Sequence, residues 1–216
     1  SIPQERGMGS SAAVANACVK AIFDFFNQPL SEDDRFELVQ VSETLAHGTP
    51  SGLDAKTTNS LLPLYFIKDK VIEPFSMVME GYIIVGDTGE KGQTRMAVSS
   101  LRKRKEKNPA VVNELMNQIG EYSEQARLCL QNNLIDQLGD LMDKTHQNLM
   151  LLGVSNQILN RLVNVARQSG AKGAKMTGGG WGGCMIALAK THQQAHQIAN
   201  ALKRNGAAQT WILELG

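Results

Sequence analysis

The spacing of apolar residues predicts an alternation of helices and strands along the chain. Apolar positions three and four residues apart indicate helices, and short apolar runs bounded by turn formers indicate strands. The first helical run is apolar nearly all round, so we expect it to be buried. The predicted helices cover 10–26, Ser31 to about Ala46, 94–106, 109–131, 134–152, 155–169 and 192–205. The predicted strands cover 62–67, 70–75, 81–87, 172–177, 184–189 and 208–215.

The order of these elements predicts a two-layer α+β protein with a division near residues 76–80. The last third of the chain is predicted to be strand, turn, strand, helix, strand. No internal repeat or low-complexity linker separates the two parts. We therefore expect one domain over 1–76 and a second over 77–216.

Composition narrows the class of protein. The 216 residues are 42% hydrophobic and 20% charged, which is typical of a packed globular core. A net charge of +1 does not favour a nucleic-acid or membrane-surface partner, and no apolar run approaches the ~18 residues of a membrane span. Three widely spaced cysteines, Cys18, Cys129 and Cys184, indicate a reducing compartment rather than a disulfide framework, so we expect a cytoplasmic protein.

A glycine-rich turn at residues 3–13 leads directly into the first predicted helix. The first turn of a helix has N–H groups without partners inside the helix, and its dipole end is positive. Gly7 and Gly9 allow close backbone approach and Ser10 and Ser11 add hydroxyl groups, so the turn suits a polyphosphate. Two alternatives stay open: a plain helix cap, and a G-x-G-x-x-A dinucleotide fingerprint that lacks its preceding strand.

Two carboxylates fall on one helix–loop unit. Asp54 follows Ser51 and Gly52 in a loop dense in turn formers, and Glu43 lies eleven residues earlier, in the last turns of the preceding predicted helix. One carboxylate of such a pair can hold a metal while the other takes a proton. The structural alternative is that Asp54 forms an Asx-turn and Glu43 is a solvated helix residue.

The segment Lys175–Cys184 contains five glycines in six positions, 178–183. Helix and strand preferences do not explain such a run, whereas positive φ angles and close backbone approach do. Between two predicted strands it forms a wide hairpin that can lean over a bound group. The alternative is a merely flexible turn. Trp181 within it, like Trp211, is expected to be a packing residue.

Two further patterns are assigned structural roles. His192 and His196 have the i, i+4 spacing that zinc ligands can have, but no third ligand is evident, so we expect a solvated helix face. Residues 102–105, with the sequence Arg-Lys-Arg-Lys, end a predicted helix, where the negative end of the helix dipole favours cations. A solvated helix end is preferred there over a phosphate clamp.

The three segments, in this order, resemble motifs of the GHMP kinase family. Residues 3–13 match the family's phosphate loop, P-x-x-x-G-L-G-S-S-A-A, with Met8 in place of the usual Leu. Lys175–Cys184 resembles its late glycine-rich motif, K-x-T-G-A-G-G-G-G-C. There Gly179 replaces an Ala and Trp181 replaces a Gly.

Residues 43–54 have every fixed position of E-x-x-x-H-G-x-P-S-G-x-D, the pattern of the branch of that family that phosphorylates mevalonate. Residues 93–95, Gln-Thr-Arg, also resemble the family's N-T-R. The resemblance implies a GHMP kinase architecture of two domains. The first would be part of a ribosomal protein S5 domain 2-like domain, and the second a ferredoxin-like α/β sandwich.

The implied reaction is transfer of the γ-phosphoryl group of ATP to the 5-hydroxyl of mevalonate, with Mg²⁺ as cofactor. By this resemblance Asp54 would accept the alcohol proton, and Ser11 and Glu43 would hold Mg²⁺. The residues expected at the phosphates are Gly7, Met8, Gly9, Ser10, Ser11 and Ala12. The residues expected at the substrate are His47, Gly48, Thr94, Gly178 and Gly179.

The family's first motif, a lysine-bearing strand with a G-E-H segment, would precede Ser1. We therefore expect an N-terminal segment of the same enzyme as a further partner beside mevalonate and ATP, and expect the fragment alone to be nearly inactive. A homodimer is left open. Two alternatives also stay open: another small-molecule kinase of the family, such as one acting on phosphomevalonate, and a non-catalytic nucleotide-binding protein on the same fold.

Overall fold

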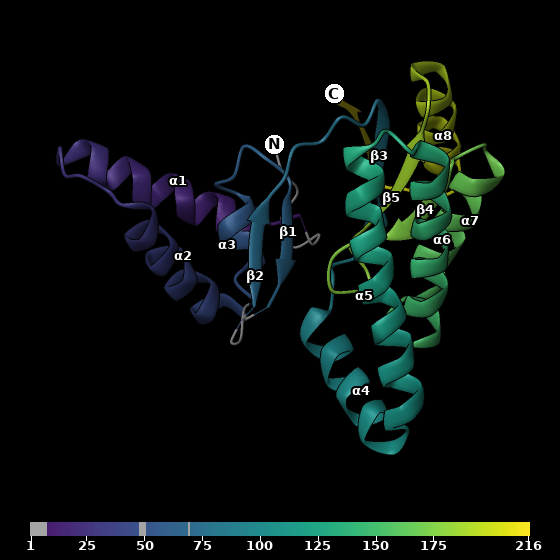
Figure 1. Cartoon of the computed structure of the whole chain (residues 1–216), viewed down its shortest axis with the longest axis horizontal. Helices are drawn as coiled ribbons and strands as arrows, with labels where there is room; N and C mark the ends of the chain where they lie inside the picture. The colour runs from purple at the N-terminus through teal and green to yellow at the C-terminus, as the bar shows by residue number, and fades with distance from the viewer. Residues whose placement is uncertain (1–7, 48–50, 69) are drawn as a thin grey trace. The chain divides into compact units, whose positions relative to one another are not determined.

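The structure, a computed structural model, describes residues 8–47, 51–68 and 70–216. It divides into two compact units, Ser1–Ser76 and Met77–Gly216 (Figure 1). Among the described residues, no helix has both the length and the apolar character that crossing a bilayer requires.

The first unit consists of helices followed by a β-hairpin. Ser31, where the second predicted helix begins, caps that helix, because its Oγ accepts the Asp34 N–H at 3.0 Å. Ala12, Val39 and Ala55, one from each helix, form the buried cluster that joins the three. The elements are α1 (Ser10–Phe25), α2 (Glu32–His47), α3 (Leu53–Thr57), β1 (Leu64–Ile67) and β2 (Val71–Pro74).

The predicted burial of α1 is wrong for the described structure. Ala12 is fully buried, but Val14, Ile22 and Phe25 are 61%, 56% and 79% exposed. In the described part of this unit α1 packs against α2 and α3 along one side. Ala15 and Val19 also pack partly against that junction, but the apolar side chains on the other side of α1 are uncovered in the described structure. An apolar sequence favours burial but does not supply the element that would cover it.

The second unit is a four-stranded antiparallel sheet with five helices among its described residues. The strand order is β4-β5-β3-β6, in which the two central strands are the first and third along the chain. This is the ferredoxin-like arrangement, with α4, α5 and α6 inserted before α7. The elements are β3 (Gly81–Asp87), α4 (Thr94–Lys107), α5 (Pro109–Gln131), α6 (Ile135–Leu151), α7 (Gln157–Gln168), β4 (Gly173–Met176), β5 (Cys184–Ala189), α8 (His192–Arg204) and β6 (Gln209–Leu215).

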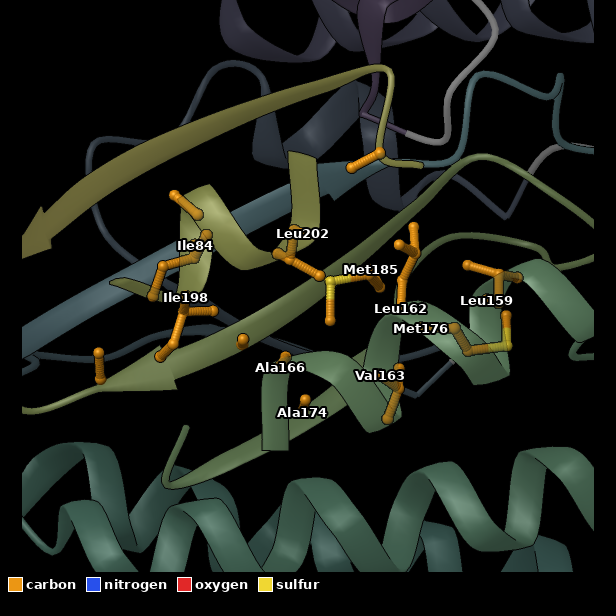
Figure 2. Close-up of a cluster of buried hydrophobic side chains, with 14 of the residues drawn as sticks. Ile84, Leu159, Leu162, Val163, Ala166, Ala174, Met176, Met185, Ile198 and Leu202 are labelled. Carbon is orange, nitrogen blue, oxygen red and sulfur yellow. The ribbon is translucent and has the colours of Figure 1, made fainter. Parts of the chain in front are cut away.

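Helices cover both faces of this sheet, so the unit has three layers rather than the predicted two. On one face, Ile84 and Met185 pack against Leu162 of α7 and Ile198 of α8 (Figure 2). On the other face, the cluster around Leu188 includes residues of α5 and α6. The physical reason is that successive residues of β3 and β5 are apolar, and a strand of this kind is buried on both sides.

Candidate active site

The start of α1 has the backbone geometry expected of an anion site. Gly9 adopts φ 66°, a left-handed conformation, and its carbonyl accepts the Ala13 N–H at 2.9 Å. The first-turn N–H groups, from Ser10 onward, therefore point out of the helix end. Met8, Gly9, Ser10 and Ser11 are half-buried. Gly7 lies outside the described residues.

Asp54 lies in the first turn of α3, which corrects the prediction of a continuous loop. Gly52 precedes the helix with φ 84°, and Ser51 Oγ accepts the Leu53 N–H at 3.2 Å. A hydroxyl at this position supplies a partner for an N–H that the helix itself leaves unpaired. The dense turn formers of the sequence therefore begin a short helix that carries Asp54.

Side-chain contacts tie α3 to both neighbouring helices. Asn16 of α1 donates to Thr58 Oγ1 at 2.5 Å, and Thr58 Oγ1 donates to the Asp54 carbonyl at 2.8 Å. On the other side, Lys56 Nζ lies 3.9 Å from the centre of the Phe36 ring of α2. These contacts hold the backbone that carries Asp54 against α1.

The Asp54 carboxyl group lies beside the start of α1. A β-carbon built on Gly9 would be 3.8 Å from Asp54 Cγ and 3.8 Å from Oδ1. The positive end of the helix dipole favours a negative charge at this place. The structure thus joins Asp54 to the candidate phosphate loop, although the two are far apart in the sequence.

Glu43 is buried, so the alternative of a solvated helix residue does not hold for it. Its exposure is 3%. Glu43 lies one turn beyond Val39 on the same face of α2, and Val39 packs against Ala12 of α1 and Ala55 of α3. The carboxylate therefore comes from the face of α2 that is turned toward the α1–α3 junction.

Two predicted substrate residues of this unit are not tested by the structure. Gly48 and the side chain of His47 lie outside the described residues, and His47 is described only as the last residue of α2. Among the described residues, no group of three or more His, Cys, Asp or Glu side chains is arranged to hold a metal ion.

The second unit brings Thr94 and the glycine-rich loop together. Thr94 is the first residue of α4. A β-carbon built on Gly179 would lie 2.1 Å from Thr94 Oγ1, so only glycine allows this contact. Gly178, the neighbouring candidate, is exposed. The predicted substrate residues Thr94, Gly178 and Gly179 therefore lie within one small region.

The glycine-rich loop is held in place, in contrast to the alternative of a flexible turn. The Gln93 N–H donates to the Gly180 carbonyl at 3.2 Å, and the Gly183 N–H donates to the Glu90 carbonyl at 2.9 Å. A β-carbon on Gly180 would lie 2.2 Å from the Val154 carbonyl oxygen. Part of the glycine run is thus required by packing against the protein's own backbone. As expected, Trp181 is a packing residue, set against the core of the sheet.

Two ionisable residues lie at the base of this loop, and one of them, His146, was not identified from the sequence. His146 of α6 is 4% exposed, and its Nδ1 accepts the Met176 N–H at 3.3 Å. Burial, together with the charge of Lys175, lowers the pKa of His146 to about 4. Burial also lowers the pKa of Lys175, to about 8. The available signal was the position of His146, four residues after Met142 on the apolar face of the helix.

The two patterns given structural roles are as expected. His192 and His196 are exposed on α8, with their Nε2 atoms 3.1 Å apart. No third ligand joins them among the described residues. The basic residues 102–105 are exposed near the end of α4.

Models of one family match both ends of the chain. The model described as GHMP kinases N terminal domain matches residues 1–57, and that described as GHMP kinases C terminal matches residues 126–208. Together they cover more than half of the chain, and they include the α1–α3 junction and the glycine-rich loop. The chain therefore belongs to the GHMP kinase family.

Within that family the chain is similar to mevalonate kinases. It is 38% identical to the mevalonate kinase of Pyrococcus horikoshii over 210 residues, which are 95% of this chain and 62% of that protein. It is also 38% identical to the mevalonate kinase of Thermococcus onnurineus, with 93% of this chain and 60% of that protein covered. The chain thus spans about three fifths of the length of these relatives.

Solved structures show the same similarity. The L. major mevalonate kinase in complex with R-mevalonate has a TM-score of 0.90 at 29% identity, with 98% of this chain and 66% of that chain covered. The mevalonate kinase of Staphylococcus aureus MRSA252 has a TM-score of 0.75 at 33% identity, with 100% and 69% covered. A phosphomevalonate kinase of Streptococcus pneumoniae, with a TM-score of 0.80 at 17% identity and 97% and 69% covered, shares the fold.

Proposed function

We propose that this chain belongs to an enzyme that transfers the γ-phosphoryl group of ATP to the 5-hydroxyl of mevalonate. One observation carries the proposal: the Asp54 carboxyl group lies beside Gly9 at the start of α1. A polyphosphate site and a candidate base are thereby adjacent. The similarity to mevalonate kinases over nearly the whole chain supports the choice of substrate.

The phosphates would bind the backbone of the α1 start. The residues from Gly7 to Ala12 would surround them, with N–H groups and the helix dipole offsetting their charge. No lysine of a P-loop is needed for this mode of binding. Most of the rate acceleration would come from positioning and charge stabilisation, as in other phosphoryl transfers.

Asp54 would accept the proton of the attacking hydroxyl. The side chain is exposed, so an alcohol can reach it. An alcohol oxygen bound at this carboxylate would be close to a phosphate held on the helix start, since Asp54 and Gly9 are neighbours. A positioned base of this kind contributes typically about 10²–10⁴-fold to the rate.

Ser11 and Glu43 would hold Mg²⁺. The fit is chemical: both side chains offer oxygen, the ligand atom that Mg²⁺ prefers, and Glu43 offers it as a carboxylate on the buried face of α2. Mg²⁺ sites in kinases use one or two carboxylates beside the phosphates of the substrate, so a larger acidic cluster is not required. The ion, when bound, neutralises negative charge on the phosphate oxygens.

His47, Gly48, Thr94, Gly178 and Gly179 are proposed as substrate contacts. A place in isoprenoid biosynthesis follows from mevalonate as substrate. A cytoplasmic location, a homodimer and a contribution from a further N-terminal segment stay predictions of the sequence.

A coupled ATPase assay on the full-length protein tests the proposal, with mevalonate and phosphomevalonate compared side by side. Turnover is expected with mevalonate and not with phosphomevalonate. Turnover with phosphomevalonate and not with mevalonate would show that the protein is the alternative kinase, which acts on phosphomevalonate. ATP binding without turnover on either alcohol would favour a non-catalytic nucleotide-binding protein.

A further inference from the structure

Trp181 has an unusual backbone conformation for its size. Its φ is 55°, in the left-handed region that bulky residues rarely adopt. It stands in a run of glycines, at the position where the family motif has glycine. A strained conformation of this kind persists only where the surrounding contacts hold it, and such residues often lie at functional sites.

Two hydrogen bonds hold Trp181 on the turn that follows α6. Its backbone N–H donates to the Val154 carbonyl at 3.0 Å, and its indole N–H donates to the Gly153 carbonyl at 2.8 Å. Gly180 packs against the same turn, with no room for a β-carbon beside the Val154 oxygen. The tip of the glycine-rich loop is therefore attached to this turn by both backbone and side chain.

The stem of the loop is attached to α6 itself. On β4, the edge strand that leads into the loop, the Ala174 N–H donates to Asp143 Oδ1 at 2.9 Å and the Met176 N–H donates to His146 Nδ1 at 3.3 Å. Asp143 in turn accepts from Arg167 Nε at 2.8 Å. Helix α6 and the turn after it thus form one frame that holds stem and tip.

On its opposite side the loop reaches the start of α4. Gly179 touches Thr94, and the Gly180 carbonyl accepts the Gln93 N–H. The loop therefore lies between α4 and the turn after α6, and the candidate substrate residues Gly178 and Gly179 are fixed at the same time.

From this arrangement we propose that Trp181 is a positioning residue: it fastens the glycine-rich loop to the turn at Gly153 and Val154 and keeps it ordered before substrate binds. The proposal rests on the proposed function, in which the loop contacts the substrate. When the loop is already ordered, the substrate does not have to supply the free energy of ordering it. The apparent affinity for the substrate then rises in proportion to the fraction of molecules whose loop is in the binding conformation.

Hydrogen exchange of the loop in the full-length protein tests the fastening directly. Trp181→Gly removes the indole hydrogen bond to Gly153 and the packing of the ring, but it keeps the backbone N–H that donates to Val154. Glycine also adopts the left-handed conformation without strain. Exchange of residues 178–183 should rise about tenfold, the effect of one hydrogen bond of ordinary strength. Trp181→Phe keeps an aromatic ring but loses the indole N–H donor, and the exchange rate of the loop should rise less in this variant. Trp211→Phe, on β6, is the matched control and should leave the loop unchanged.

Steady-state kinetics separate positioning from packing. Trp181→Gly should raise KM for the alcohol about tenfold with little change in kcat, because saturating substrate restores the ordered loop. Unchanged loop exchange and unchanged KM would overturn the proposal. A lower kcat and melting temperature at unchanged KM would also overturn it, since Trp181 would then be a packing residue only.

The two proposals fail in different ways. If the wild-type protein does not phosphorylate mevalonate, the proposed function fails. The exchange measurement alone then decides whether Trp181 fastens the loop. If Trp181→Gly does not fold, Trp181→Phe supplies both measurements.

Discussion

The carboxyl group of Asp54 faces Gly9 across the junction of α1 and α3, where a β-carbon on Gly9 would be 3.8 Å from Oδ1. Two structural features create this pairing. Gly9 adopts a left-handed conformation and has no side chain of its own at the helix start, and the contacts of α3 with α1 and α2 bring Asp54 to it. A negative side chain that accepts a proton is thereby placed beside a site for negative phosphates.

Asp54→Asn should remove turnover while ATP still binds. The amide is the same size but does not take a proton at neutral pH, so kcat should fall by at least about 100-fold. Isothermal calorimetry with an ATP analogue should show affinity close to that of the wild type. Asp33→Asn, at an exposed position of α2, is the control. More than about a tenth of wild-type kcat in Asp54→Asn would contradict the role of Asp54 as a base.

Glu43→Gln should raise the concentration of Mg²⁺ needed for half-maximal rate. The amide keeps the volume in the buried site but removes the charge that a divalent cation prefers. Titration of the rate with Mg²⁺ at fixed ATP measures the shift. Glu37→Gln, exposed on the same helix, should titrate as the wild type does. An unchanged Mg²⁺ titration in Glu43→Gln would remove Glu43 from the proposed ligands.

Gly179→Ala should damage the site because the new methyl group would lie 2.1 Å from Thr94 Oγ1. Either the loop or the start of α4 must move, at a cost of roughly 1–3 kcal/mol, and KM for the alcohol should rise. Denaturant unfolding and steady-state kinetics measure both effects. Gly120→Ala is the matched control, because nothing lies within 4 Å of its β-carbon and alanine favours the helix. If the two variants had the same free energy of unfolding and the same KM, the loop would be able to accommodate the methyl group without loss of stability.

His146 should make stability depend on pH. Its pKa is about 4 in the folded protein against an ordinary value near 6.5. The folded protein thus binds a proton on His146 less readily than the unfolded chain does. The contribution of neutral His146 to the free energy of unfolding is therefore complete above pH 6.5 and is lost as the pH falls toward 4. The difference between the two pKa values corresponds to about 3 kcal/mol.

The variant His146→Asn isolates this effect, since asparagine can accept from the Met176 N–H but does not titrate. Urea unfolding at pH 4 and pH 7 should give a larger loss of free energy in the wild type than in the variant. The same loss in both proteins would mean that His146 is not the titrating group.

Local pattern was enough to predict most elements of the fold. The strands 81–87 and 184–189 and the helix 109–131 have the predicted bounds, because each is a strong apolar pattern between clear turn or cap signals. The short helix α3 was missed, since five residues are too few for a helical period to show. The glycine-rich segments were identified from the sequence, but only part of the reason for their glycines was predicted. Gly179 and Gly180 are required because other atoms of the protein itself lie against them.

The sequence by itself determined the elements, the two motifs rich in glycine and the candidate acids, because these depend on neighbouring residues and on short spacings. Only the tertiary structure decided that Asp54 meets Gly9, that Glu43 is buried while much of α1 is not, and that Trp181 fastens a loop. Burial and contact depend on which distant segments pack together, and that information does not reside in any single local pattern.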